Sequence, residues 1–262
     1  MERIQEILTT IDNWLWGNWL LFVLLAVGIL YTVISGGVQV RHFKYIIKKT
    51  LIHPIRYGDK DTNSEGSVSS FQALNMAIAS CVGSGNIVGV ATAVLAGGLG
   101  AIFWMWVSAF LGMATIYGEA VLAQTYKTEV NGEVTGGPVY YIKAAFKGTF
   151  GKGLAALFAV FIVLALGFMG NMVQSNSIGA AFVEAFEVFH INLSPVIVGI
   201  VVAVIAAVIF LGGTKSLATV VEKVVPIMAG IYIVGSLILI CMNITAVPAA
   251  FVSIFRGAFA PE

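Results

Sequence analysis

Six segments of this chain are apolar over a length that crosses a lipid bilayer as an α-helix. The hydrocarbon core of a bilayer is about 30 Å thick, which a helix spans with roughly 20 residues. Runs such as Val196 to Leu211 do not alternate, whereas a transmembrane strand alternates apolar and polar side chains. The pattern therefore predicts an all-α transmembrane protein, with helices at about residues 17–36, 69–97, 100–126, 153–177, 195–212 and 225–245.

The composition excludes several classes of protein. Apolar residues make up 59% of the chain and charged residues 10%, whereas soluble domains average about 45–50% and about 25%. The net charge of +1 offers no basic face for nucleic acid. No Ser, His and Asp set converges at one depth of the predicted helices, so an intramembrane enzyme is not supported. We expect a non-enzymatic protein surrounded by the lipid bilayer.

Basic residues gather in alternate loops, which predicts the topology. The loops 97–100 and 179–194 contain no Lys or Arg. Loops rich in Lys and Arg remain in the cytoplasm. We therefore expect a multi-pass plasma-membrane protein with its N-terminus outside and with the second helix entering from the cytoplasm. The cytoplasmic loops carry Arg41, Lys44, Lys48, Lys49, Arg56 and Lys60, then Lys127, Lys143, Lys147 and Lys152, then Lys215 and Lys223.

The second segment contains glycines near its midpoint. Gly83 and Gly85 flank Ser84 and precede Asn86, and a glycine inside a helix costs about 1 kcal/mol relative to alanine. A helix broken between Cys81 and Asn86 would offer free carbonyls to a cation and free N–H groups to an anion. The alternative is that the helix stays intact and packs against another helix through small residues, because Gly85 and Gly89 are four residues apart and share one face. Spacing alone favours the packing interpretation slightly. The paired glycines at mid-membrane depth nevertheless lead us to predict an interruption between about Cys81 and Asn86.

The fourth segment carries amides on one helical face. Asn171 and Gln174 are three residues apart and share this face with Gly167, next to Phe168. We expect Gly83, Ser84, Gly85 and Asn86 to contact a solute from one side, and Phe168, Asn171 and Gln174 from another. Asn176 and Ser177 fit an ordinary interfacial helix end equally well. No Lys or Arg lies at mid-membrane depth, which favours a small neutral or zwitterionic solute.

Glu119 is the one ionisable residue well inside a predicted helix core. Three roles compete for it: binding a coupling proton or cation, accepting hydrogen bonds from N–H groups freed by the break, or extending to the cytoplasmic surface. We favour the second role, which predicts that Glu119 is buried and faces the break. The remaining candidate ligands, His42, His53 and His190, show no metal-ligand spacing.

Taken together, these segments resemble the alanine or glycine:cation symporter family, the sodium:alanine symporters of bacteria and archaea. Leu99, Val139 and Ser84 depart mildly from the family pattern. The resemblance rests on FQAL at residues 71–74, VGSGNIVGVATA at 82–93, GAIFWMW at 100–106, GMAT at 112–115, EAVLA at 119–123, GGPVYY at 136–141 and GNMVQ at 170–174.

The resemblance implies a LeuT-like fold of two inverted five-helix repeats. On this mapping residues 1–68 hold an extra transmembrane helix and a cytoplasmic loop. Residues 69–246 form the first repeat, and 247–262 form an external segment. Six transmembrane helices then precede a second repeat that is absent from the 262 residues. We expect a truncated piece of a transporter, and the alternative is a half-sized protein that pairs with another chain.

The resemblance also implies sodium-coupled symport of alanine or glycine across a prokaryotic plasma membrane. The carbonyls of Ala79 and Val82 would form part of one sodium site. The Cys81 carbonyl and the Asn86 side chain would form part of another. The alternatives are a proton-coupled transporter or one for another small solute in the same superfamily, and a non-transporting subunit whose glycine face packs against a partner.

Overall fold

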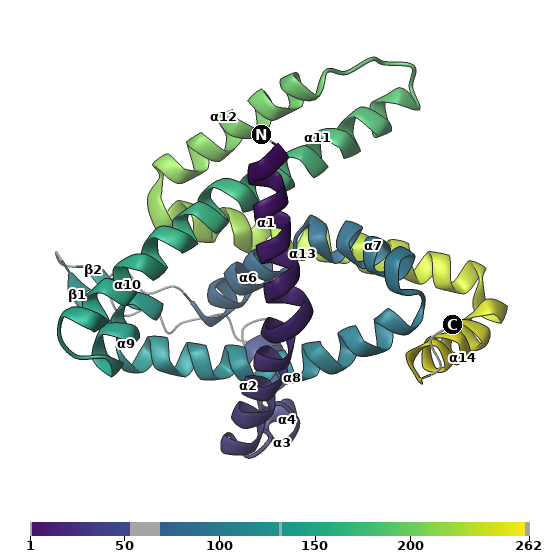
Figure 1. The fold of residues 1–262 in the computed structure, drawn as a ribbon. Helices are drawn as coiled ribbons and strands as arrows, with labels where there is room; N and C mark the ends of the chain where they lie inside the picture. Colours follow the sequence, from purple (N-terminus) through teal and green to yellow (C-terminus); the bar gives the residue numbers. More distant parts are fainter. Residues whose placement is uncertain (1, 53–68, 131–132, 260–262) are drawn as a thin grey trace.

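The structure is a computed structural model that describes residues 2–52, 69–130 and 133–259. These ranges are almost entirely helical (Figure 1). Four helical stretches are long and apolar enough to cross a membrane: Arg3–Ile34, Gly100–Thr125, Thr149–Glu187 and Ser216–Met242. A fifth is a bent pair, Phe71–Cys81 with Ser84–Gly97. The prediction of an all-α membrane protein is confirmed at this level.

The long stretches consist of several elements. The first joins α1 (Glu2–Trp14), a π-helical turn η1 (Leu15–Leu20) and α2 (Leu21–Ile34). The second is α8 (Gly100–Thr125). The third joins α10 (Thr149–Ile162), a π-helical stretch η4 (Val163–Gly170) and α11 (Asn171–Glu187), and the fourth lies in α13 (Gly213–Met242). The bent pair comprises α6 (Ser70–Cys81), one 3-10 turn η3 (Ser84–Asn86) and α7 (Val88–Gly97).

Three predicted boundaries are wrong, each because the helix continues through polar sequence. The first helix begins near residue 2 rather than 17, and the last begins at Gly213 rather than 225. The fourth extends to Glu187 instead of ending at 177, so Asn176 and Ser177 lie inside a helix rather than at its end. Lipid requires apolar side chains, but a helix does not, so helices extend beyond the apolar windows.

Shorter elements connect the spans. The predicted segment 195–212 forms α12 (Pro195–Leu211), whose 17 residues correspond to about 25 Å. A short helix, α9 (Pro138–Ala145), follows Gly137 with a φ of 108°. Strands β1 (Thr128–Val130) and β2 (Glu133–Thr135) pair antiparallel, a hairpin that the apolar pattern does not predict. The chain then ends in a 3-10 turn η5 (Ile244–Ala246) and α14 (Val247–Phe259).

Helix α8 is the element on which two distant parts of the chain pack. On α8 itself, Ala114 is fully buried. A Cβ atom added at Gly28 of α2 would lie 2.8 Å from the Cβ atom of Leu111 of α8, so the two helices are close at this point. At the other end of α8, the backbones of Gly100 and Gly257 of α14 touch. Glycine allows helix backbones to approach this closely.

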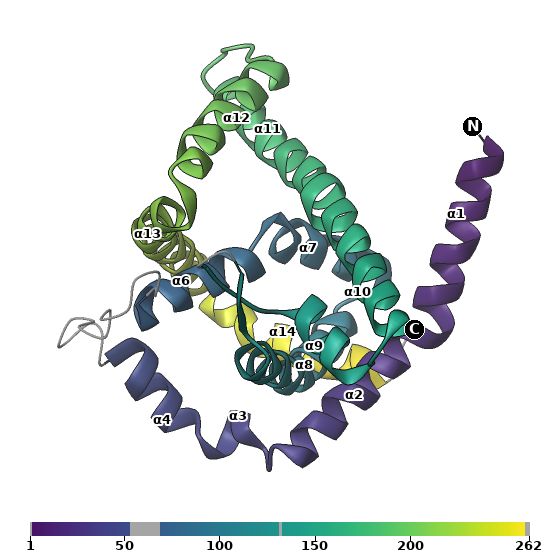
Figure 2. The ribbon, with the colours of Figure 1, turned by 90° about the vertical axis from the view of Figure 1, so that its left-hand side faces the viewer.

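The remaining helices pack in pairs rather than around one core. Helix α6 packs on α13 and α11 packs on α12, and in Figures 1 and 2 the α11–α12 pair projects away from the other helices. The chain exposes 20111 Å², whereas a compact soluble monomer of this length exposes about 11,000 Å². Much of the apolar surface is therefore free to contact lipid or further protein.

Candidate ion and solute site at an interrupted helix

The second predicted helix is interrupted where its glycines lie. Helix α6 ends at Cys81, Val82 and Gly83 are extended, and α7 resumes at Val88 after η3. The two halves are bent by 66°. The Oδ1 atom of Asn86 accepts a hydrogen bond of 3.1 Å from the N–H of Gly83 and so stabilises the non-helical turn. The predicted interruption between Cys81 and Asn86 is confirmed.

The interruption frees backbone carbonyls. Because the N–H of Gly83 bonds to Asn86, it does not reach the carbonyl of Ala79. Among the described residues, the carbonyls from Ala79 through Val82 receive no backbone N–H. They include Ala79, Cys81 and Val82, the residues whose carbonyls are expected to bind sodium. Carbonyl oxygens are hard ligands of the kind that alkali and alkaline-earth cations prefer.

The interruption also frees backbone N–H groups. Within the described ranges, neither Ser84 nor Gly85 donates a backbone hydrogen bond. The first bond of α7 runs from the N–H of Ala91 to the carbonyl of Ile87, so the first amides of α7 are also free. Such a helix start attracts a carboxylate through its N–H groups and its dipole. A cation acceptor and an anion donor therefore lie within a few residues of each other.

Gln174 of α11 lies beside the break. A Cβ atom added at Gly83 would lie 2.9 Å from the Nε2 atom and 3.2 Å from the Oε1 atom of Gln174. Only a residue without a side chain leaves room for this approach. The structure thus brings Gln174 to the break, as expected, although the two residues are far apart in the sequence.

The other two residues expected on this wall lie differently. Asn171 uses its Nδ2 atom to donate to the carbonyl of Gly167 at 3.0 Å. Phe168 belongs to η4 and is 66% exposed. Both lie on the same continuous helix as Gln174, one and two turns before it.

The prediction that Glu119 is buried is wrong. Its side chain is exposed, because the buried face of α8 is formed by Ala114 and Gly118 and the next residue points about 100° away. The carboxylate of Glu119 lies near Tyr141 of α9 instead. Burial raises the pKa of the Tyr141 phenol, and the nearby charge of Glu119 raises it further.

The first half of the broken helix, α6, is anchored by residues that the apolar pattern does not single out. The Oγ atom of Ser69 accepts from the N–H of Gln72, and the Oε1 atom of Gln72 accepts from the N–H of Ser69, both at 3.1 Å. This reciprocal cap follows a Ser-x-x-Gln pattern that precedes an apolar run. The Nε2 atom of Gln72 also donates to Glu222 of α13 at 2.9 Å.

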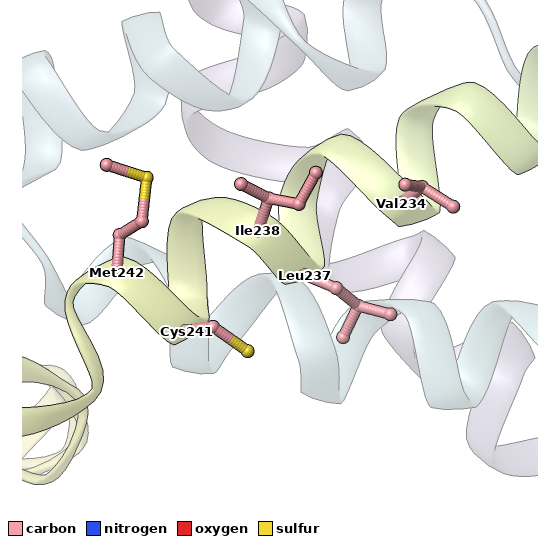
Figure 3. A pocket seen from close by; sticks show the side chains of 5 residues that line it. All are labelled: Val234, Leu237, Ile238, Cys241 and Met242. Atoms are coloured by element: carbon pink, nitrogen blue, oxygen red, sulfur yellow. The ribbon is translucent and has the colours of Figure 1, made fainter.

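An open hollow on α13 is a poor alternative site. Its lining is Val234, Leu237, Ile238, Cys241 and Met242, all on one helix (Figure 3). These side chains carry no charge and offer almost no polar surface. Such a surface suits lipid tails, so the interrupted helix remains the candidate for ion and solute binding.

Comparison with known proteins identifies the family. A model of the sodium:alanine symporter family matches residues 1–262. The sodium/alanine symporter AgcS of Methanococcus maripaludis is 42% identical over 256 residues, which cover 97% of this chain and 54% of that protein. The putative sodium/proton-dependent alanine carrier protein YrbD of Bacillus subtilis is 40% identical over 257 residues, covering 98% and 50%.

A third relative, the amino-acid carrier protein AlsT of Bacillus subtilis, is 39% identical over 251 residues, covering 96% of this chain and 50% of that protein. The chain spans about half the length of the curated relatives it matches. All three are carriers or symporters by name rather than enzymes. With a match along its whole length and relatives of this similarity, the chain belongs to the sodium:alanine symporter family.

Proposed function

We propose that this chain forms part of a cation-coupled symporter for small neutral amino acids, alanine or glycine, with sodium as the coupling ion. The observation that carries the proposal is the pairing of free carbonyls at Ala79 to Val82 with free N–H groups at Ser84 and Gly85. A zwitterionic amino acid needs a donor for its carboxylate, and sodium needs carbonyl oxygens. One interruption offers both the donors and the carbonyl oxygens, and two relatives of the chain are named for alanine.

The substrate site comprises Gly83, Ser84, Gly85 and Asn86 on one side and Phe168, Asn171 and Gln174 on the other. The closeness of Gly83 and Gln174 supports this pairing. One sodium ion binds the carbonyls of Ala79 and Val82, and a second binds the Cys81 carbonyl and Asn86. The Oδ1 atom of Asn86 already accepts from Gly83, but an amide oxygen has a second lone pair for a cation.

The proposed architecture is LeuT-like, with residues 69–246 as one five-helix repeat after an extra helix in 1–68 and before an external segment, 247–262. Residues Cys81, Val82, Gly85 and Asn86 are exposed in this chain, whereas solute sites normally bury most of the ligand. Further protein therefore completes the site, either as a second repeat or as a pairing chain. We also propose that the N-terminus lies outside, which the basic loops favour.

The packing interpretation has less support. Within the described ranges, a Cβ atom added at Gly85 or Gly89 would meet nothing within 4 Å. These glycines are therefore not where the described helices approach one another. Proton coupling is the second candidate, because the name of YrbD mentions both ions.

The deciding experiment is uptake of labelled alanine into proteoliposomes by the transporter that contains this chain. An imposed sodium gradient should drive accumulation, and a potassium gradient of the same size should not. Uptake driven by a proton gradient alone would show that the coupling ion is the proton rather than sodium. Absence of alanine or glycine uptake under every gradient would reject it.

A further inference from the structure

A basic segment leaves the inner end of the first span sideways. The chain turns at Gly36 and Gly37, with φ values of 62° and 67° in the left-handed region that favours glycine. It continues as α3 (Val38–Arg41), α4 (Phe43–Ile47) and a π-helical turn η2 (Lys48–Ile52). Figure 2 shows α3 and α4 running away from the end of α2 at a steep angle.

The turn is held by hydrogen bonds. The N–H of Gly37 donates to the carbonyl of Thr32 at 2.9 Å, and the Nε2 atom of Gln39 donates to the Oγ1 atom of Thr32 at 3.1 Å. Val38 is buried. The direction of the segment is therefore fixed by the end of a membrane-crossing helix. This places the segment at the level where that helix leaves the bilayer.

The charge on this segment has one sign. Arg41, Lys44, Lys48 and Lys49 are all exposed, and no Asp or Glu occurs in the sequence between residues 13 and 58. The four cations thus have no acidic neighbour along the chain to neutralise them. A surface of this kind is complementary to an anionic one.

Large apolar side chains lie among these cations. Val40 is 67% exposed, Phe43 59% and Ile46 41%. Phe43 and Ile46 are three residues apart and share one side of α4, whereas Lys44 and Lys48 share another. Apolar residues beside Lys and Arg on a helix parallel to the membrane are typical of segments that insert at the headgroup boundary. Lys and Arg then extend toward the phosphates while their stems remain apolar.

We propose that residues 38–49 form a binding surface for the headgroups of anionic phospholipids. The segment that carries this surface contacts two of the long helices, since α3 touches α8 and η2 touches α6, the first half of the interrupted helix. Lipid bound there steadies the end of α6. This proposal does not depend on which solute or ion is carried.

The experiment measures which lipids surround this surface in the whole chain. Tyr45 is exposed between the cations, so a Tyr45→Cys variant carries a bimane label after the two exposed free thiols, Cys81 and Cys241, are changed to Ser. The labelled protein is placed in phosphatidylcholine vesicles that contain equal amounts of either brominated phosphatidylcholine or brominated phosphatidylglycerol. Bromine quenches the label only at short range.

Quenching by phosphatidylglycerol should exceed that by phosphatidylcholine about fivefold or more, since each cation near an anionic surface contributes about this factor. The Lys44→Gln, Lys48→Gln and Lys49→Gln triple variant should lower the ratio several-fold, leaving only the contribution of Arg41. Matched changes at Lys143, Lys147 and Lys152, which lie in another basic loop, should leave it unchanged.

Equal quenching by the two lipids in the unsubstituted protein would overturn the proposal, because the cations would then be merely hydrated. If the triple variant fails to fold, a salt titration of the unsubstituted protein decides. High salt should lower the ratio by screening, and a ratio that ignores salt would also overturn the proposal.

Discussion

The Nε2 atom of Gln72 donates a hydrogen bond of 2.9 Å to the Oε2 atom of Glu222, 150 residues away in the chain. This bond joins the first half of the interrupted helix, α6, to the N-terminal part of α13. Gln72 is held in place by its reciprocal cap with Ser69. The side-chain amide of Gln72 thus caps the start of α6 and also holds α6 against α13.

Replacing Glu222 with alanine should therefore weaken the docking of α6 on α13. Removing the acceptor leaves a partly buried amide donor without a partner, which costs about 1–3 kcal/mol. Unfolding of the purified chain by denaturant in micelles would measure the loss. Glu222→Gln is the control, because its amide oxygen still accepts, and it should cost clearly less. Equal stability of the alanine variant and the parent would contradict the prediction.

The contact between α2 and α8 gives a prediction with a matched pair of glycines. A Cβ atom at Gly118 would overlap the ring of Tyr31, whereas one at Gly112, six residues earlier on α8, would meet nothing within 4 Å. Gly118→Ala should destabilise the protein by about 1–3 kcal/mol through overpacking. Gly112→Ala should be neutral or slightly stabilising. Thermal unfolding of both variants, followed by circular dichroism, would compare their stabilities. An unchanged stability of Gly118→Ala would contradict the prediction and show that α2 can shift to accommodate the added methyl group.

Gly85 allows the proposed site to be tested without disturbing the packing of the described helices. A side chain there has open space in this chain, yet it would project from the turn whose N–H groups are proposed to bind the carboxylate. Gly85→Leu should abolish alanine uptake by the transporter that contains this chain, while the protein still reaches the membrane. Gly112→Leu, on a different helix with equally open surroundings, should retain uptake. Normal uptake by Gly85→Leu would remove this residue from the site.

The interruption can be predicted from local sequence because its causes are local, although the spacing of the glycines alone fits a packing face slightly better. Gly83, Gly85 and Asn86 weaken the helix and cap the turn within four residues. Local sequence does not predict that Glu119 is exposed, since the face that a helix buries depends on which neighbour packs against it. The Gln72–Glu222 bond joins residues 150 positions apart, and the spacing of residues within a helix cannot predict a contact between such distant segments.

Helix ends were harder to predict than helix centres for a related reason. Asn171 and the four residues from Gln174 to Ser177 are polar, yet the helix passes through them to Glu187, because backbone hydrogen bonding does not require apolar side chains. The hydropathy of a segment indicates where lipid lies, and the backbone determines where the helix stops.

Asn86 provides the sharpest test of the coupling ion. Its Oδ1 atom stabilises the turn by accepting from Gly83 and is also proposed to bind sodium. Asn86→Ala removes both functions, whereas Asn86→Asp keeps an oxygen for each. In uptake assays at fixed alanine, Asn86→Ala should raise the half-saturating sodium concentration about tenfold or more, which corresponds to a loss of about 1.4 kcal/mol. Asn86→Asp should stay much closer to the parent.

The two variants separate ion binding from the shape of the turn. If Asn86→Ala changes the alanine KM but leaves the sodium dependence intact, the side chain shapes the turn and does not bind the ion. Sodium binding by the 262-residue chain alone, measured by calorimetry with and without alanine, completes the test. Because residues at the break are exposed in this chain, sodium should bind weakly and alanine should not strengthen it. Tight, alanine-dependent binding by this chain would instead favour two copies that complete each other's sites.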